Sequence, residues 1–111
     1  MSGIAELNAS PSRSFTDAAG TLYRPRIDVR ALVKFETQTG VCLLNAGPDP
    51  FQGKLTNLMR LAFLACDEQV TQAGRDFDTF CAAFTSETLT RGLSEATAGA
   101  LADFFQSRTG N

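Results

Sequence analysis

The residues that could carry out chemistry in this chain are three cysteines and a few carboxylates, because the sequence contains no histidine. Histidine is the commonest general base and metal ligand at neutral pH, so a nucleophilic cysteine would lack its usual partner. Cys42, Cys66 and Cys81 are widely spaced and form no CxxC pair, so no metal site is predicted. We expect buried thiols in a reducing compartment, with Cys42 as the weak candidate for a nucleophile because it lies near a predicted loop.

The carboxylates and glycines give no stronger case for catalysis. Asp76 and Asp78 are two positions apart, and on a helix such residues face apart, which disfavours an acid/base pair. Residues 51–56 (FQGKLT) contain Gly-Lys-Leu-Thr, but Gly47 is one place away from the P-loop spacing and no strand precedes it. The sequence therefore predicts a protein that is not an enzyme and that uses no cofactor, metal or small-molecule substrate.

Composition and charge exclude other classes of partner. The formal net charge is -2, and the Lys and Arg residues are spread along the sequence, which disfavours nucleic acid. The longest apolar run, residues 61–66, is far shorter than the ~18 residues that cross a bilayer. Residues 1–14 lack the basic and then apolar pattern of a secretory signal. We expect a cytoplasmic protein that binds neither nucleic acid nor membrane.

The 111 residues predict one domain. Residues 1–12 are small and polar, so we expect a flexible arm, with a short helix over residues 4–9 as the alternative. Residues 13–106 form the predicted domain, and residues 107–111 form a frayed tail.

The domain begins with a predicted β-hairpin. Phe15 precedes the turn DAAG, in which Asp17 bonds the backbone and Gly20 takes a positive φ. The second strand contains Tyr23, and the loop is expected to have about three to four residues. Pro25 cannot donate a ladder hydrogen bond, so this strand ends there or lies at an edge. A lone hairpin is marginal in water, so it must pack on the helices.

A short helix follows over residues 28–40. Asp28 is the predicted N-cap and Gly40 the left-handed residue that ends the helix. The apolar residues on one side of it are Val29, Leu32 and Val33. Phe35 flanks this stripe and is expected to anchor the helix to the hairpin, while Glu36 caps the helix or pairs with Arg26.

Three more helices complete the predicted fold. The first covers residues 51–66, is capped by Asp49 and Pro50, and is apolar on most sides, which places it in the core. The second begins after Asp76 and buries Phe77, Phe80, Cys81 and Phe84. The third begins at residue 85 or 86 and is interrupted near Gly92. The fold class is therefore mainly α (α+β), with an N-terminal β-hairpin followed by a small bundle of about four helices.

Small residues interrupt the apolar stripe of the last helix. Gly92 and Gly99 each cost about 1 kcal/mol in a helix relative to alanine. Together with Ala96 and Ala100 they form a narrow flank, which either packs inside the domain or lets another backbone approach closely.

The motifs in this order resemble a known family. The pattern A-L-x-x-F-E-x-x-T-G is formed by Ala31, Leu32, Phe35, Glu36, Thr39 and Gly40. A leucine-rich helix follows, with Leu55, Leu58, Leu61, Ala62 and Leu64, and the next helix starts at Asp76 and Phe77. Over about residues 15–105 the chain resembles the small tail assembly chaperones of long-tailed bacteriophages.

This resemblance implies a non-catalytic function. Such a chaperone binds the tape-measure protein, keeps it soluble in the host cytoplasm, helps to recruit tail-tube protein and is absent from the finished virion. Self-association is also expected. The candidate partner-binding residues are Tyr23 at the hairpin edge and Phe104 and Phe105 near the C-terminus. Because adjacent helical residues point about 100° apart, one of these phenylalanines is exposed or covered by the hairpin or a second copy; the alternative is two ordinary core residues.

Two other classes of protein remain as alternatives. One is a structural virion component, such as a tail completion or connector protein. The other is a small helical domain that binds nucleic acid, which the acidic pI of about 5.0 disfavours.

Overall fold

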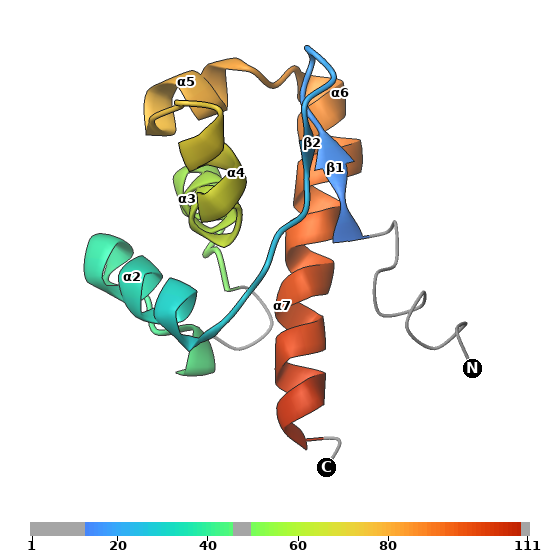
Figure 1. Ribbon diagram of the computed structural model, residues 1–111. Coiled ribbons are helices and arrows are strands. Elements are labelled where there is room, and N and C mark those ends of the chain that lie inside the picture. The colour runs from blue at the N-terminus through green and yellow to red at the C-terminus, as the bar shows by residue number, and fades with distance from the viewer. Residues whose placement is uncertain (1–12, 46–49, 110–111) are drawn as a thin grey trace, which may run out of the picture.

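The computed structural model describes residues 13–45 and 50–109 of the chain. The predicted arm (1–12), the predicted cap at Asp49 and the last two residues lie outside this part. The described chain forms a two-stranded antiparallel sheet followed by helices, which confirms the predicted mainly helical α+β class. Figure 1 shows α6 (Ser86–Thr88) and α7 (Ser94–Thr109) in line along the height of the molecule, with the hairpin beside the upper part of this column.

The hairpin forms where the turn chemistry predicted it. Strand β1 (Phe15–Thr16) pairs with β2 (Leu22–Tyr23), and Phe15 lies opposite Tyr23. The Asp17 carboxylate accepts the N–H groups of Ala19 and Thr21, each at 2.9 Å. Gly20 takes a positive φ of 88°. The loop covers residues 17–21, slightly longer than predicted.

The helices follow in the expected order, with two short additions, η2 (Leu43–Asn45) and α4 (Asp67–Gln72). The longer ones are α2 (Val29–Thr39), α3 (Leu55–Ala65) and α7 (Ser94–Thr109). The other short ones are α5 (Phe77–Ala82) and α6 (Ser86–Thr88). The segment of α4 was predicted to be a link between helices. Helix α7 continues to Thr109, into the predicted tail.

The start of α3 differs from the prediction. Phe51 was expected to lie in this helix, but Gln52 and Gly53 have φ values of 55° and 68°, which no right-handed helix contains. The helix therefore begins at Leu55. The side chain of Leu55 was expected in the core stripe and is 55% exposed.

The predicted interruption of the last helix is a π-helical turn, η3 (Leu89–Leu93), which joins α6 to α7. The small residues there serve packing within the domain. A Cβ placed on Gly92 would lie 3.3 Å from the Cβ of Phe15, and one on Gly99 would lie 2.6 Å from the Arg13 guanidinium. The same guanidinium pairs with Asp103 at 2.5 Å, so Arg13 and Phe15 cover the two glycines of the narrow flank.

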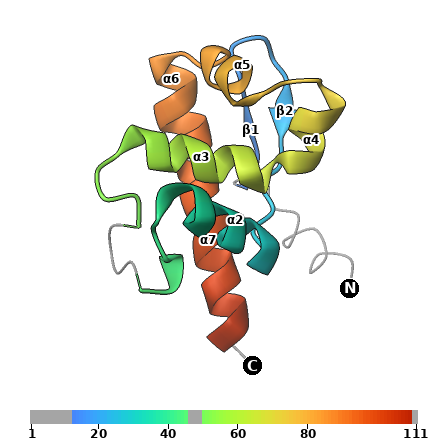
Figure 2. The ribbon, with the colours of Figure 1, turned by 90° about the vertical axis from the view of Figure 1, so that its left-hand side faces the viewer.

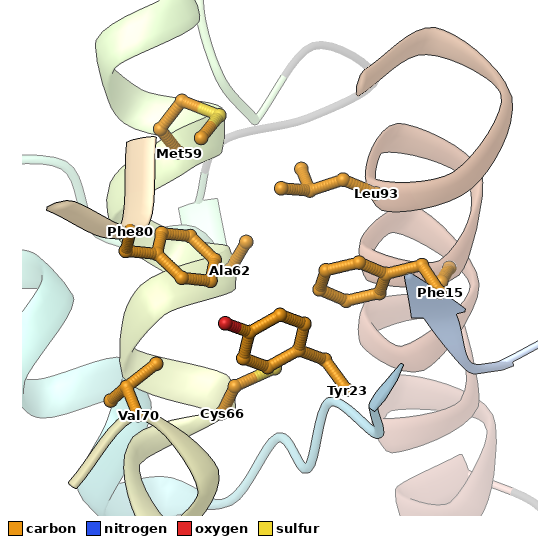
Figure 3. Packing of buried hydrophobic residues seen from close by; sticks show 9 residues of the cluster. Phe15, Tyr23, Met59, Ala62, Cys66, Val70, Phe80 and Leu93 are labelled. Atoms are coloured by element: carbon orange, nitrogen blue, oxygen red, sulfur yellow. The ribbon is translucent and has the colours of Figure 1, made fainter. Parts of the chain in front are cut away.

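A first core joins the hairpin to α3, α4, α5 and the π-helical turn. Its buried members are Phe15, Tyr23, Met59, Ala62, Cys66, Val70, Phe80, Leu93 and Ala96. Figure 3 shows Tyr23 and Phe15 pointing from the hairpin toward Phe80 and Ala62. The ring of Tyr23 lies 5.3 Å from that of Phe15 and 5.3 Å from that of Phe80. This hairpin core is therefore largely aromatic.

A second core lies below the first, where α2 and α3 pack against α7 (Figure 2). Its buried members are Phe35, Val41, Leu43, Leu61, Leu64 and Leu101. Phe35 is 0% exposed, but it belongs to this core and not to the hairpin core. The expectation that Phe35 anchors α2 to the hairpin was therefore wrong, because this helix packs on α3 and α7 instead.

Candidate partner-binding surface

Helix α2 has two apolar faces, and the structure buries the one that the sequence analysis did not choose. Phe35 belongs to the second core, and the side chains of Ala31 and Phe35 are 6% and 0% exposed. Val29 and Val33 are 65% and 57% exposed. Both pairs are four residues apart, so each forms a stripe along the helix. The stripe of Val29 and Val33 was predicted as the main apolar side of the helix, and it faces solvent.

This exposed stripe forms one wall of an apolar groove with a volume of ≈ 230 Å³. The groove is lined by Val29, Leu32, Val33, Glu36, Cys42, Leu43, Leu44 and Phe104. Leu44, in η2 directly after α2, is 61% exposed. Water thus reaches several large apolar side chains at one place, and such a patch on a small protein marks an interaction site more often than single exposed residues do.

The structure separates the two predicted phenylalanines at the C-terminal end. Both are half-buried, and their rings meet edge to face with centroids 5.4 Å apart. Phe105 packs against the second core, whereas Phe104 lines the apolar groove. Adjacent residues of a helix point about 100° apart, which accounts for this division.

Tyr23, the third predicted partner residue, lies inside the protein. It is 0% exposed, and its hydroxyl accepts a hydrogen bond from Arg75 at 2.6 Å. The expectation that Tyr23 forms part of a partner surface therefore needs correction. A two-residue strand cannot hold itself together, so its aromatic side chain must fill the core to secure the hairpin.

Arg75 also binds the buried carboxylate of Asp17, at 2.5 Å, and so ties the hairpin turn to the loop before α5. Burial alone would raise the pKa of Asp17. The hydrogen bonds from Arg75 and from the Thr21 and Ala19 amides outweigh burial and hold this pKa below its usual value.

Residues predicted as structural motifs place α2 and hence the groove. The Asp28 carboxylate accepts the Ala31 N–H at 2.9 Å, as an N-cap should. Gly40 has a φ of 79°, and its N–H donates to the Glu36 carbonyl at 2.7 Å, which ends the helix. Glu36 itself is exposed and lines the apolar groove. None of the ion pairs between described residues links it to Arg26.

A second, larger groove of ≈ 840 Å³ lies along another side of α2. Four basic residues line this basic groove: Arg24, Arg26, Arg30 and Lys34. The Arg26 N–H donates to the Ala65 carbonyl at 2.8 Å, which holds the β2–α2 segment against α3. The basic residues are thus less evenly spread than the sequence suggested. The acidic residues Asp28, Asp67 and Glu68 line the same groove and offset part of its charge.

Two of the cysteines have thiols whose pKa is raised by burial. Cys66 is 0% exposed, and burial raises the pKa of its thiol. Burial likewise raises the pKa of Cys81. A thiol with a raised pKa is a weak nucleophile at neutral pH. Between residues 13 and 109, with the gap at 46–49, no three Cys, Asp or Glu side chains lie close enough together to hold a metal ion.

Sequence reasoning placed Val29, Leu32 and Val33 on one apolar side of the helix but did not name this side as a partner surface, so it missed the groove. A signal was present: Ala31 and Phe35 define a competing apolar face, and a helix of 11 residues at the surface needs only one face for the core. The second face was therefore available for a partner.

Comparison with protein-family models, with curated proteins and with solved structures found no match. Within the described residues, none of the helices combines the length and the apolar character needed to cross a bilayer.

Proposed function

We propose that this protein is a non-catalytic tail assembly chaperone of a long-tailed bacteriophage. In the host cytoplasm it binds the tape-measure protein and helps to recruit tail-tube protein around it. The observation that carries the proposal is the exposed apolar stripe of α2, where Val29 and Val33 are 65% and 57% exposed beside the apolar groove.

The groove suits a helical partner. A helix binds such a groove by inserting side chains at i, i+3 or i+4 and i+7 from its apolar face. A tape-measure protein is a long helical chain with apolar seams, so it offers this kind of face repeatedly. Covering the groove also removes apolar area from water, at roughly 25 cal/mol per Å². Binding also removes the apolar seam of the partner from water. An exposed seam would otherwise favour aggregation of the partner.

The residues of the A-L-x-x-F-E-x-x-T-G pattern support this function because they position α2 and the apolar groove. Ala31 and Phe35 fix the buried face of α2, and Gly40 ends the helix so that η2 can carry Leu44 to the groove. The motif thus accounts for the orientation that leaves the other stripe exposed.

Co-expression tests the proposal directly. The chain is produced together with the long helical protein encoded next to its gene, and the soluble fraction of that protein is measured with and without the chain. We expect the chain to raise this fraction and to co-purify with it. If the helical protein stays insoluble in both cases, the proposal is wrong.

Two variants locate the effect. Val33→Asp places a charge on the exposed stripe and should abolish co-purification. Leu55→Asp makes the same change at a residue that is 55% exposed and lies outside the groove, so it should retain co-purification. Mass spectrometry of purified particles tests the alternative, because a structural virion component would be present in them.

A further inference from the structure

We infer that the partner segment that binds this surface is an amphipathic helix with carboxylates along one edge of its apolar stripe. The inference rests on the proposed function and adds the chemistry by which the partner is recognised. It comes from the position of α2, which borders the apolar groove on one side and the basic groove on the other.

The sequence of α2 places the two kinds of side chain next to each other. Val29 and Val33 form the apolar stripe. Arg30 directly follows Val29, and Lys34 directly follows Val33. One position is about 100° around a helix, so the basic stripe borders the apolar stripe over the same two turns. Arg30 and Lys34 are both exposed. A helix lying in the apolar groove would therefore bring one of its edges near both charges.

The four basic residues of the basic groove keep their charge available for a partner. Across the described residues, the ion pairs are Arg13–Asp103, Arg75–Asp17 and Arg91–Glu87. None of them uses a basic residue of this groove. Within the described part of the chain, Arg30 and Lys34, which lie beside the exposed apolar stripe, therefore take part in no ion pair.

The acidic residues of the basic groove limit what else could bind there. Asp28 uses its carboxylate to cap α2. Asp67 and Glu68 lie in the first turn of α4, where a negative charge interacts favourably with the helix dipole. These three carboxylates would repel the closely spaced phosphates of a nucleic acid, whereas a helix can place its few carboxylates next to Arg30 and Lys34 alone.

A second copy of this chain matches the surface less well. If α2 met another α2, the only acidic residue that this helix could offer is Glu36. One carboxylate cannot pair with both Arg30 and Lys34 along two turns of the helix, so charge complementarity favours a separate, acidic partner over self-association through this face.

The test uses two designed helical peptides of about 18 residues with the same leucine stripe. One carries glutamate along one edge of the stripe, and the other carries lysine at the same positions. Binding to the full chain is measured by fluorescence anisotropy. We expect the glutamate peptide to bind about fivefold or more tightly than the lysine peptide, and the difference to shrink as salt screens the charges.

A charge swap identifies the residue responsible. Lys34→Glu should remove or reverse the preference for the glutamate peptide. Arg91→Glu is the matched control, since it makes the same change in charge at a side chain that is 82% exposed and lies outside both grooves. The control should keep the wild-type preference.

Three results would overturn the inference: no binding of either peptide at about 1 mM, equal binding of both, or tighter binding of the lysine peptide. Concentration-dependent dimerisation that Val33→Asp abolishes would also overturn it, because a second copy would then be the occupant. These outcomes are separate from the proposed function, which fails only if the long helical protein is not kept soluble.

Discussion

The hairpin end and the α2 end of this protein differ in how they treat large apolar side chains: the first buries most of them and the second exposes several of them. At the hairpin end, the aromatic rings of Phe15, Tyr23 and Phe80 are buried, and the buried carboxylate of Asp17 is hydrogen-bonded to Arg75. At the α2 end, large apolar side chains remain in water beside a groove. The first arrangement stabilises the fold, and the second leaves free energy to be gained when a partner binds. Substitutions at the two ends should therefore affect different measurements.

The largest effect is expected from Phe80→Ala. Phe80 is 0% exposed and contacts three other aromatic rings, so its removal should lower the free energy of unfolding by about 3–5 kcal/mol. Phe104→Ala at the α2 end, where the ring is half-buried beside the groove, should cost less than half as much. Urea denaturation of both variants measures the difference. Equal losses in the free energy of unfolding would contradict the contrast between a well-packed hairpin end and an exposed α2 end.

Next in size is Arg75→Met. It leaves the buried carboxylate of Asp17 without its cation and should cost about 2 kcal/mol at neutral pH. Because the folded-state pKa of Asp17 is lowered, its contribution is present above the unfolded-state pKa of about 3.9 and is lost as pH falls through the folded value.

The pH dependence provides the control for this prediction. Wild-type protein should lose stability below about pH 4, and Arg75→Met should lose less over the same range, since the stabilising bond is already absent. Urea denaturation at several pH values measures both curves. Parallel curves would show that Asp17 is not the group responsible.

A smaller effect is expected at the start of α2. Asp28→Ala removes the N-cap and should lower the free energy of unfolding by about 1 kcal/mol. Asp28→Asn keeps a side-chain oxygen for the cap and should recover most of this loss. If Asn is no better than Ala, the cap does not hold α2 in place. Thermal denaturation of the three proteins measures the order.

The smallest effect on stability is expected from Val33→Asp, within about 0.5 kcal/mol of wild type, because the side chain is already 57% exposed. Ala31→Asp, two positions away, should destabilise the protein strongly, because it would place a charge at a side chain that is only 6% exposed. A large loss from Val33→Asp would mean that this stripe packs within the protein. Circular dichroism during urea denaturation measures both variants.

Much of the local structure was predictable from short stretches of sequence. The turn at Asp17 and Gly20, the caps at Asp28 and Asp76 and the stop at Gly40 all form as predicted. Each depends on hydrogen bonds or φ values within about four residues of the motif. The interruption near Gly92 was also visible, since glycine weakens a helix wherever it stands.

The candidate surface was only partly predictable. Phe104 was among the predicted partner residues and lines the apolar groove, whereas Tyr23 was predicted there and is buried. Val29 and Val33 were predicted to lie on one apolar side of α2 and were not among the predicted partner residues. All four residues are apolar, and the sequence does not show which of these side chains packs against another helix or strand and which stays exposed.

By itself, the sequence determined the hairpin, most of the helices and where α2 begins and ends, because these choices depend on neighbouring residues. It did not determine α4 or the start of α3. Only the tertiary structure decided which face of α2 is buried. That choice depends on α3 and α7, whose core residues Leu61 and Leu101 contribute to the same cluster as Phe35 from distant positions in the chain. Once Phe35 was inside, the rotation of the helix left Val29 and Val33 in solvent and placed Arg30 and Lys34 beside them.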